Sequence, residues 1–272
     1  MKFISTVLLM GLLLCVACHS HQARQAEAKN DSIHIIPSSL LKAGEPDIKL
    51  SQEALLGKIN PAQDTGFVLI GREFTNKEKI YLRKPTYEAF VRMAKAAREA
   101  GHNLQIISAT RNFSAQKRIW EAKWNGQRKV AGMDLSQAMP DLKQRALKIL
   151  EYSSMPGTSR HHWGTDLDIN ALNNRYFTSG KGKRIYDWLL DHASAYGFCQ
   201  VYTQKGTERP HGYNEEKWHW SYMPLSSQFL EQYNQQIDYD DLGGFEGEQV
   251  ARELEAIRKY VNGIAPPCLL WE

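Results

Sequence analysis

The sequence lacks several features that mark common classes of protein. Its 272 residues contain no block of lysine or arginine and no internal repeat, and the formal net charge is only +4. Nucleic-acid binding therefore has little support. Beyond the N-terminal region only Cys199 and Cys268 remain, and neither has a second cysteine nearby, which argues against a cysteine-based zinc site. The length suffices for one globular domain with extensions.

The N-terminal apolar run is also short. It extends from Val7 to Ala17, after the basic residue Lys2, and is too brief for a comfortable membrane span. A basic start, an apolar centre and a small residue before Cys18 predict a secretory signal peptide over residues 1–17. We therefore expect an exported protein of the cell envelope.

The end of this signal resembles that of bacterial lipoproteins, with the letters C-V-A-C at residues 15–18. Cys15 departs from that pattern, which usually has leucine at this position. The resemblance implies that Cys18 is lipidated and anchors the protein to a membrane, facing the periplasm or the cell wall. Ordinary signal cleavage and an uncleaved anchor are the alternatives.

Residues 18–49 are rich in Gln, Ala, Lys, Asn and Ser, which predicts a flexible tether. A globular pattern begins near residue 50. We assign residues 50–240 to a catalytic domain and 241–272 to a C-terminal helical extension of unassigned role. Cys199 and Cys268 can pair in an oxidising compartment, but sequence alone does not give their separation.

Hydrophobic spacing predicts a mixture of helices and short strands. Pro85 begins the clearest helix and Gly101 ends it, while Asn112 or Ser114 can cap the next one. Further helices are expected at 140–152, 183–196, 226–236 and 248–262, and strands at 67–70, 104–109, 198–203 and 217–223. This order favours an α+β fold with an antiparallel sheet over a doubly wound parallel sheet.

Two polar clusters carry the chemistry. The first is the stretch 159–168, and the second is Glu216-Lys217-Trp218-His219. Catalytic zinc commonly takes three protein ligands from His, Asp and Glu and keeps a fourth position open. We predict His161, Asp168 and His219 as the metal ligands, which leaves Glu216 free as general base.

The spacing within the clusters makes two further predictions. Glu216 and His219 would point to opposite faces of an ideal strand, so Glu216 must lie on the preceding loop or at a bulge. Asp166 shares a strand face with Asp168 and is either a supporting residue or an alternative ligand. His162 is interpreted as structural, and Arg160 as an exposed charge.

Taken together, the motifs resemble the VanY-type D-alanyl-D-alanine carboxypeptidases, zinc peptidases of the M15 family. The residues that carry the resemblance are Ser159-x-His161-x-x-Gly164-x-x-x-Asp168, Glu216-x-Trp218-His219, and the upstream segment Ser108-Ala109-Thr110-Arg111-Asn112-Phe113-x-x-Gln116. The family implies Zn²⁺ bound by the three predicted ligands. It also implies a small antiparallel sheet flanked by helices with the zinc site on the sheet, the D,D-peptidase/Hedgehog-like fold.

The resemblance extends to substrate contacts. It implies Glu216 and Arg111 as catalytic residues, and Ser159, Gln116 and Trp218 as substrate-binding residues. Arg111 either stabilises the oxyanion of the reaction or binds the terminal carboxylate, since a guanidinium suits both tasks. Asp166 stands where the family often has a small residue.

The expected function is removal of the C-terminal D-amino acid from peptidoglycan stem peptides by a monomer. Alternatives of the same fold are an L,D-carboxypeptidase and an endopeptidase for cross-links. A non-catalytic lipoprotein that binds cell-wall peptides is the rival class. Glu216 argues against it, because a purely structural zinc needs no free carboxylate beside an open site.

Overall fold

The computed structural model describes residues 47–270. The predicted signal at 1–17, the predicted lipidation site at Cys18 and most of the predicted tether, up to residue 46, lie outside the described residues. Within residues 47–270, no helix is both long enough and apolar enough to cross a membrane. The described residues fall within one compact unit.

A four-stranded antiparallel sheet occupies the centre of this unit. Its strands are β3 (Ile106–Ser108), β4 (Asp166–Ile169), β5 (Phe198–Cys199) and β6 (His219–Tyr222). Their order across the sheet is β3-β4-β6-β5, so the last strand of the chain lies between two earlier ones. All residues of β4 and β6 are buried, as expected for central strands covered on both faces.

A two-stranded hairpin stands beside this sheet. It pairs β1 (Phe67–Leu69) with β2 (Tyr81–Arg83), and it meets the larger sheet where Phe74 O accepts a hydrogen bond from Ile106 N. The sequence predicted β1 but not β2, because the Tyr81–Arg83 strand runs directly into a helix without a turn signal.

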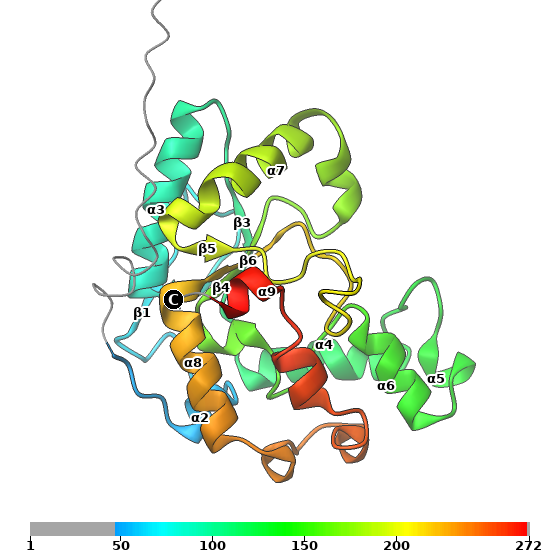
Figure 1. Cartoon of the computed structure of the whole chain (residues 1–272). Helices are drawn as coiled ribbons and strands as arrows, with labels where there is room; N and C mark the ends of the chain where they lie inside the picture. Colours follow the sequence, from blue (N-terminus) through cyan, green and yellow to red (C-terminus); the bar gives the residue numbers. More distant parts are fainter. Residues whose placement is uncertain (1–46, 271–272) are drawn as a thin grey trace, which may run out of the picture. The chain divides into compact units, whose positions relative to one another are not determined.

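Helices cover both sides of the four-stranded sheet. The α-helices are α2 (Gln52–Leu55), α3 (Lys84–Glu99), α4 (Phe113–Trp124), α5 (Leu135–Ala138), α6 (Leu142–Leu150), α7 (Gly180–His192), α8 (Met223–Gln236) and α9 (Pro266–Leu269). Short 3₁₀ turns are η1 (Arg160–Trp163), η2 (Asn174–Thr178), η3 (Ala193–Tyr196), η4 (Tyr239–Asp241) and η5 (Glu248–Val250), and η6 (Ile257–Val261) is π-helical. Figure 1 shows α7 above the sheet and α4 and α8 below it. The predicted α+β class is confirmed.

Local sequence explains the two helices nearest the site. Pro85 lies in the first turn of α3, where a missing N–H is tolerated, and Phe90 and Met93 bury its apolar face. Asn112 caps α4 by accepting a hydrogen bond from Ala115 N, and Trp120 packs inward. The expected start of α4 at Asn112 is therefore confirmed.

Two expected elements differ from the prediction. No regular helix spans 248–262, because Glu255 has a φ of +52° that interrupts the helical path between η5 and η6. The strand expected at 198–203 ends at Cys199. Beyond it, Val201 O and Tyr202 O accept hydrogen bonds from Ala265 N and Glu216 N rather than from a strand partner.

The C-terminal segment is joined covalently to the sheet. Cys199 of β5 forms a disulfide with Cys268 of α9, with a sequence separation of 69 residues, which answers the question that the sequence left open. Leu242, Phe245 and Val261 from this segment belong to the same hydrophobic core as the sheet. Closing a loop of this length stabilises the fold by about 4 kcal/mol in the chain-entropy account.

Candidate metal centre

The register of the central strands places two predicted ligands side by side. Asp168 of β4 lies directly opposite His219 of β6 in the antiparallel ladder. Cross-strand neighbours of this kind have side chains on one face within contact distance. Asp168 Oδ1 and His219 Nδ1 are accordingly 3.3 Å apart.

The third predicted ligand, His161, comes from the 3₁₀ turn that leads into β4. Gly164 ends this turn with a φ of +74°, and a Cβ at that position would lie 2.4 Å from the Phe67 ring. Glycine is therefore required both by backbone conformation and by space. His161 Nδ1 donates a hydrogen bond to Ala109 O at 2.9 Å, which turns Nε2 toward Asp168 Oδ1 at 3.5 Å.

These three side chains fit a Zn²⁺ ion. One ligand atom from each of His161, Asp168 and His219 lies within 4.8 Å of the others. Ligand atoms about 2.0–2.1 Å from a tetrahedral ion lie about 3.4 Å apart, close to the two distances given above. His161 Nε2 and Asp168 Oδ1 are also buried without any hydrogen-bond partner among the described residues. Buried polar atoms normally have a partner, and a cation bound between these atoms would supply one to both.

The electrostatics of the cluster favour a bound cation. Burial lowers the pKa of His161, helped by the nearby Arg111 charge, which keeps this ring in the neutral form that binds metals. For His219, burial acts in the same direction, but the neighbouring carboxylates of Asp166, Asp168 and Glu216 outweigh it and raise the pKa well above its usual value. Asp168 and Glu216, each 3.3 Å from Nδ1, attract a positive charge at that atom, which a metal ion supplies in place of a proton.

Glu216 lies on the loop before β6, as its odd spacing from His219 predicted. Its Oε2 is 3.3 Å from His219 Nδ1, and its side chain is only 14% exposed. Burial raises the pKa of Glu216, against the effect of its hydrogen bond to His219. A carboxylate with a raised pKa beside a metal site is suited to accept and return a proton.

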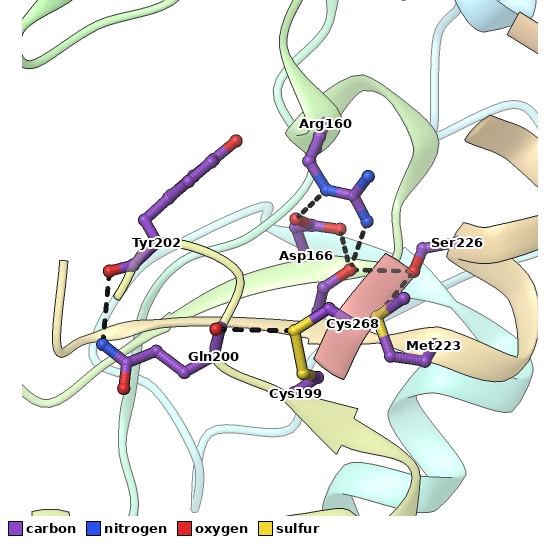
Figure 2. Close-up of a disulfide and its surroundings, with 9 residues drawn as sticks. Arg160, Asp166, Cys199, Gln200, Tyr202, Met223, Ser226 and Cys268 are labelled. Atoms are coloured by element: carbon purple, nitrogen blue, oxygen red, sulfur yellow. Dashed lines mark hydrogen bonds and ion pairs between the residues drawn. A yellow bond between two sulfur atoms is a disulfide. The ribbon is translucent and has the colours of Figure 1, made fainter. Parts of the chain in front are cut away.

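Asp166 supports His219 rather than joining the ligand group. His219 Nε2 donates to Asp166 Oδ2 at 2.8 Å, which fixes the ring and leaves Nδ1 for the metal. Asp166 is itself held by Arg160, whose Nε donates to Oδ2 at 3.2 Å, and by Ser221, whose Oγ donates to Oδ1 at 2.7 Å. Figure 2 shows the Arg160 guanidinium turned toward the Asp166 carboxylate, with Ser226 beside them.

Arg160 corrects a prediction from the sequence. We expected an exposed charge, whereas its side chain is fully buried and forms an ion pair with Asp166. Its guanidinium also lies 4.9 Å from the Trp163 ring centroid. The signal that could have revealed this arrangement was Asp166 itself, because a buried carboxylate requires a partner.

Arg111 and Ser159 border the metal cluster. Arg111 is held by its backbone, since its N–H donates to His161 O at 3.1 Å and its carbonyl accepts from His162 Nδ1 at 2.6 Å. His162 Nε2 accepts from Gly157 N, so this ring is neutral and structural, as expected. Arg111 Nε and Ser159 Oγ are both buried without hydrogen-bond partners among the described residues.

Two cavities meet at this point. The larger, about 470 Å³, is lined by Asp168, Glu216 and Trp218 at one end, and a smaller cavity of about 30 Å³ is lined by Ser159, His161 and His219. Arg111, Ser153 and Glu216 line both. Trp218 is therefore placed where a substrate could contact it.

Gln116 occupies a different position. It is buried, does not line either cavity, and its Nε2 donates to Ser154 O at 2.7 Å. Its Oε1 has no hydrogen-bond partner in the described part of the chain. Its role as a substrate contact remains a prediction.

The larger cavity also has a group of cations that the sequence did not single out. We call Arg111, Lys123, Arg128 and Lys129 the cationic wall. Lys123 comes from α4 and is only 6% exposed, whereas Arg128 and Lys129 are exposed on the following loop. None of these four side chains forms an ion pair within residues 47–270.

Two histidines and one aspartate around a metal position, with a free glutamate beside it, define a metallopeptidase-type centre. Comparison with known proteins agrees with this class. The sequence profile of the VanY D-alanyl-D-alanine carboxypeptidases matches residues 79–225, more than half of the chain. The protein belongs to the VanY family, as the sequence motifs predicted.

Two curated proteins have sequences similar to this chain. YodJ of Bacillus subtilis, whose name gives it provisionally as a carboxypeptidase, is 30% identical over 63% of this chain. A D-alanyl-D-alanine carboxypeptidase of Enterococcus faecalis is 27% identical over 57% of this chain. The chain spans only 57% and 52% of the lengths of these two proteins.

Two solved structures of peptidases are also similar to this chain. The LdcB LD-carboxypeptidase has 25% identity and a TM-score of 0.47, covering 72% of this chain and 79% of its own. A vancomycin-resistance VanY D,D-pentapeptidase variant in complex with Zn(II) has 22% identity and a TM-score of 0.43, covering 64% and 93%.

Proposed function

We propose that the protein is a zinc-dependent carboxypeptidase that removes the C-terminal D-alanine from peptidoglycan stem peptides. One observation carries the proposal. His161, Asp168 and His219 form a metal-binding group, and the free carboxylate of Glu216 lies beside it at the cavity that Arg111 also lines. Membership of the VanY family supports peptide hydrolysis and the D-alanine end.

His161, Asp168 and His219 would hold the Zn²⁺, which when bound acts as a Lewis acid and makes water a better nucleophile at neutral pH. Glu216 accepts one proton as the water oxygen forms its bond to the scissile carbonyl carbon. It then passes that proton to the amide nitrogen as the carbon–nitrogen bond breaks. The second water proton also ends on the departing nitrogen, so the products are a shortened peptide carboxylate and D-alanine with a protonated amino group.

Asp166 and Arg160 act through His219. Their hydrogen bonds hold the His219 ring in the orientation that directs Nδ1 toward Asp168. A carboxylate partner on the far nitrogen of a ligating histidine also raises the basicity of the ring. Ser159 Oγ, buried and free of hydrogen bonds in the described chain, is available to a substrate amide or carbonyl group.

The test compares peptides that differ only at the scissile bond. The purified zinc-loaded protein would be incubated with muropeptides that end in D-Ala-D-Ala, with tetrapeptides whose last bond joins an L-centre to D-Ala, and with cross-linked dimers. Mass spectrometry follows release of D-alanine. Release from the first substrate supports the D,D-carboxypeptidase. Release only from the second assigns an L,D-carboxypeptidase, and opening of the dimers alone assigns an endopeptidase.

A non-catalytic wall-binding protein is the remaining rival. It predicts muropeptide binding with no product from any of these substrates, although zinc is present. The position of Glu216 beside the ligand group supports catalysis instead.

Location and assembly belong to the same proposal. We propose an exported monomer, anchored through lipid on Cys18 and facing the periplasm or cell wall. Replacement of Cys18 by serine should move the protein from the membrane fraction to the soluble fraction, and size-exclusion chromatography with light scattering should give a mass of one chain. Unchanged fractionation would contradict the anchor without affecting the enzyme.

A further inference from the structure

Lys123 is an unusual residue for its surroundings. It lies near the end of α4, is 6% exposed, and lines the larger cavity together with Asp168 and Glu216. The only hydrogen bond of its side chain among residues 47–270 goes from Nζ to Ser153 Oγ. Lysine is almost never buried without a charged partner, because removing an ammonium group from water is costly.

The neighbours of Lys123 make this position less favourable still. Burial lowers the pKa of Lys123 to about 8, and the charges of Arg128 and Arg111 act in the same direction. Only Glu216 acts in the opposite direction. The cavity lining therefore carries four cationic side chains against two carboxylates, those of Asp168 and Glu216, and Lys123 forms no ion pair with either within residues 47–270. An arrangement of this kind is stabilised when an anion binds.

The reaction chemistry specifies where a substrate carboxylate must lie. In a peptide with a free C-terminus, the terminal carboxyl carbon is separated from the scissile carbonyl carbon by one nitrogen and one Cα, a distance of about 3–4 Å. A cation that binds this carboxylate must therefore stand close to the general base. Lys123 is the buried cation that lines the same cavity as Glu216, and its charge interacts with that of Glu216.

We propose that Lys123 binds the terminal carboxylate of the peptide and so makes this site selective for substrates with a free C-terminus. The inference rests on the proposed carboxypeptidase function. It also decides between the two roles that the sequence left open for Arg111. With Lys123 on the carboxylate, the Arg111 guanidinium is left to stabilise the negative charge that develops on the scissile carbonyl oxygen.

Ser153 has a supporting part in this proposal. Ser153 lines both cavities, and its hydroxyl accepts a hydrogen bond from the Lys123 ammonium. An ammonium group has three donors, so two remain for the two oxygens of a carboxylate. Arg128, exposed on the rim of the larger cavity, adds positive charge that attracts the anionic end of a peptide.

The test measures binding, so that it is independent of turnover. Zinc-loaded protein with Glu216→Gln would be titrated calorimetrically with D-alanyl-D-alanine and with its C-terminal amide. We expect tighter binding of the free acid. Adding Lys123→Met should weaken binding of the acid by about ten- to a hundredfold, the range for a lost charge-assisted hydrogen bond, and leave binding of the amide within about twofold.

Three further variants complete the design. Lys123→Gln keeps a donor toward Ser153 without the charge and should behave like Lys123→Met, which guards against a folding defect in either variant. Lys123→Arg keeps the charge and should retain most of the preference for the acid. Arg118→Met, an exposed position on the same helix outside the cavity lining, should bind as the parent does.

The outcomes separate this inference from the proposed function. Equal loss of acid and amide binding, or an unchanged preference for the acid in Lys123→Met and Lys123→Gln, overturns the assignment of Lys123. If the parent binds neither dipeptide, the inference is overturned as well. Carboxylate-dependent binding that requires Lys123, in a wild-type protein that releases no D-alanine, supports the inference and contradicts the proposed function.

Discussion

The metal centre and the cationic wall beside it differ in whether their charged side chains have neighbours of opposite charge. At the metal centre, the buried carboxylates lie within 4 Å of basic side chains: Asp166 beside Arg160 and His219, and Asp168 beside both ligand histidines. On the cationic wall, Lys123 is buried with only a serine hydroxyl, and Arg111 Nε has no hydrogen-bond partner within the described residues.

The difference indicates which part of the site binds the metal ion and which part binds the substrate. At the metal centre, only a cation between His161, Asp168 and His219 is needed to complete the pairing of charges. This region is therefore suited to hold a metal ion. The side chains of the cationic wall form no ion pair among the described residues, so a ligand must contribute the negative charge that pairs with them. Variants that act on one region should therefore leave the other unchanged, and the following predictions test this separation.

The largest effect is expected at Glu216, between the two regions. Glu216→Gln removes the proton acceptor while preserving shape, so the turnover number should fall by about 10²–10⁴-fold. Zinc content should not change, because Glu216 is not in the ligand group. D-alanine release and metal analysis measure the two quantities. Glu215→Gln, next in sequence and paired with Lys217, is the control and should retain activity.

The next effect concerns the metal alone. Asp166→Asn weakens the partner of His219 and should reduce zinc affinity by about 10–100-fold, measured by competition with a chelator. It also leaves Arg160 buried without a counter-charge, which destabilises the fold. The double variant Arg160→Met/Asp166→Asn should regain thermal stability but not zinc affinity. Asp187→Asn, at an exposed ion pair, is the control.

Recovery of full zinc affinity in that double variant would contradict the positioning role of Asp166. The affinity of D-alanyl-D-alanine for the zinc-saturated variant should stay close to that of the parent. A large loss of peptide affinity at saturating zinc would show that the two regions are not separate.

A smaller effect is expected from pH on the cationic wall. The pKa of Lys123 is lowered to about 8, so its ammonium is present below this pH and is lost as the pH rises through it. Arg111, Arg128, Glu216 and Ser153 are the groups that face it. KM for the free-acid peptide should increase about tenfold between pH 7 and pH 9. KM for the C-terminal amide, and the free-acid KM of Lys123→Met, should not follow this course.

The smallest effect on catalysis is expected far from both regions. Replacing Cys199 and Cys268 by serine removes the disulfide but no group of the site. The free energy of unfolding should fall by about 2–5 kcal/mol in denaturant titrations, while kcat and zinc affinity at 25 °C stay near the parent values. Loss of zinc affinity in the folded double variant would mean that the C-terminal segment helps to shape the metal centre.

Much of the site was predictable because its chemistry is local in sequence. His161, Gly164 and Asp168 are close together, and the strand-like pattern around His219 supplied the partner for Asp168. The helix beginning at Pro85 was equally clear from its apolar spacing. In each case, short-range signals and the final contacts agree.

The remainder depends on contacts that sequence spacing does not contain. Arginine is usually found at the surface, and only the pairing of β4 with β6 brings Ser221 to Arg160 beside Asp166. From the sequence alone, Lys123 looks like an exposed residue on the polar face of a helix. Only the fold places Ser153, thirty residues later, beside it. The break at Glu255 arises from a backbone conformation that has no local sequence signal.

The strand order has a consequence for how the chain folds. Since β6 lies between β4 and β5, the sheet cannot assemble in the order in which its strands occur in the chain. β5 has no neighbour to pair with until His219–Tyr222 is in place, and the same strand brings the final metal ligand. Completion of the sheet and completion of the ligand set therefore both depend on the docking of one strand. Zinc supplied during refolding should accelerate it by capturing β6 once it docks against β4.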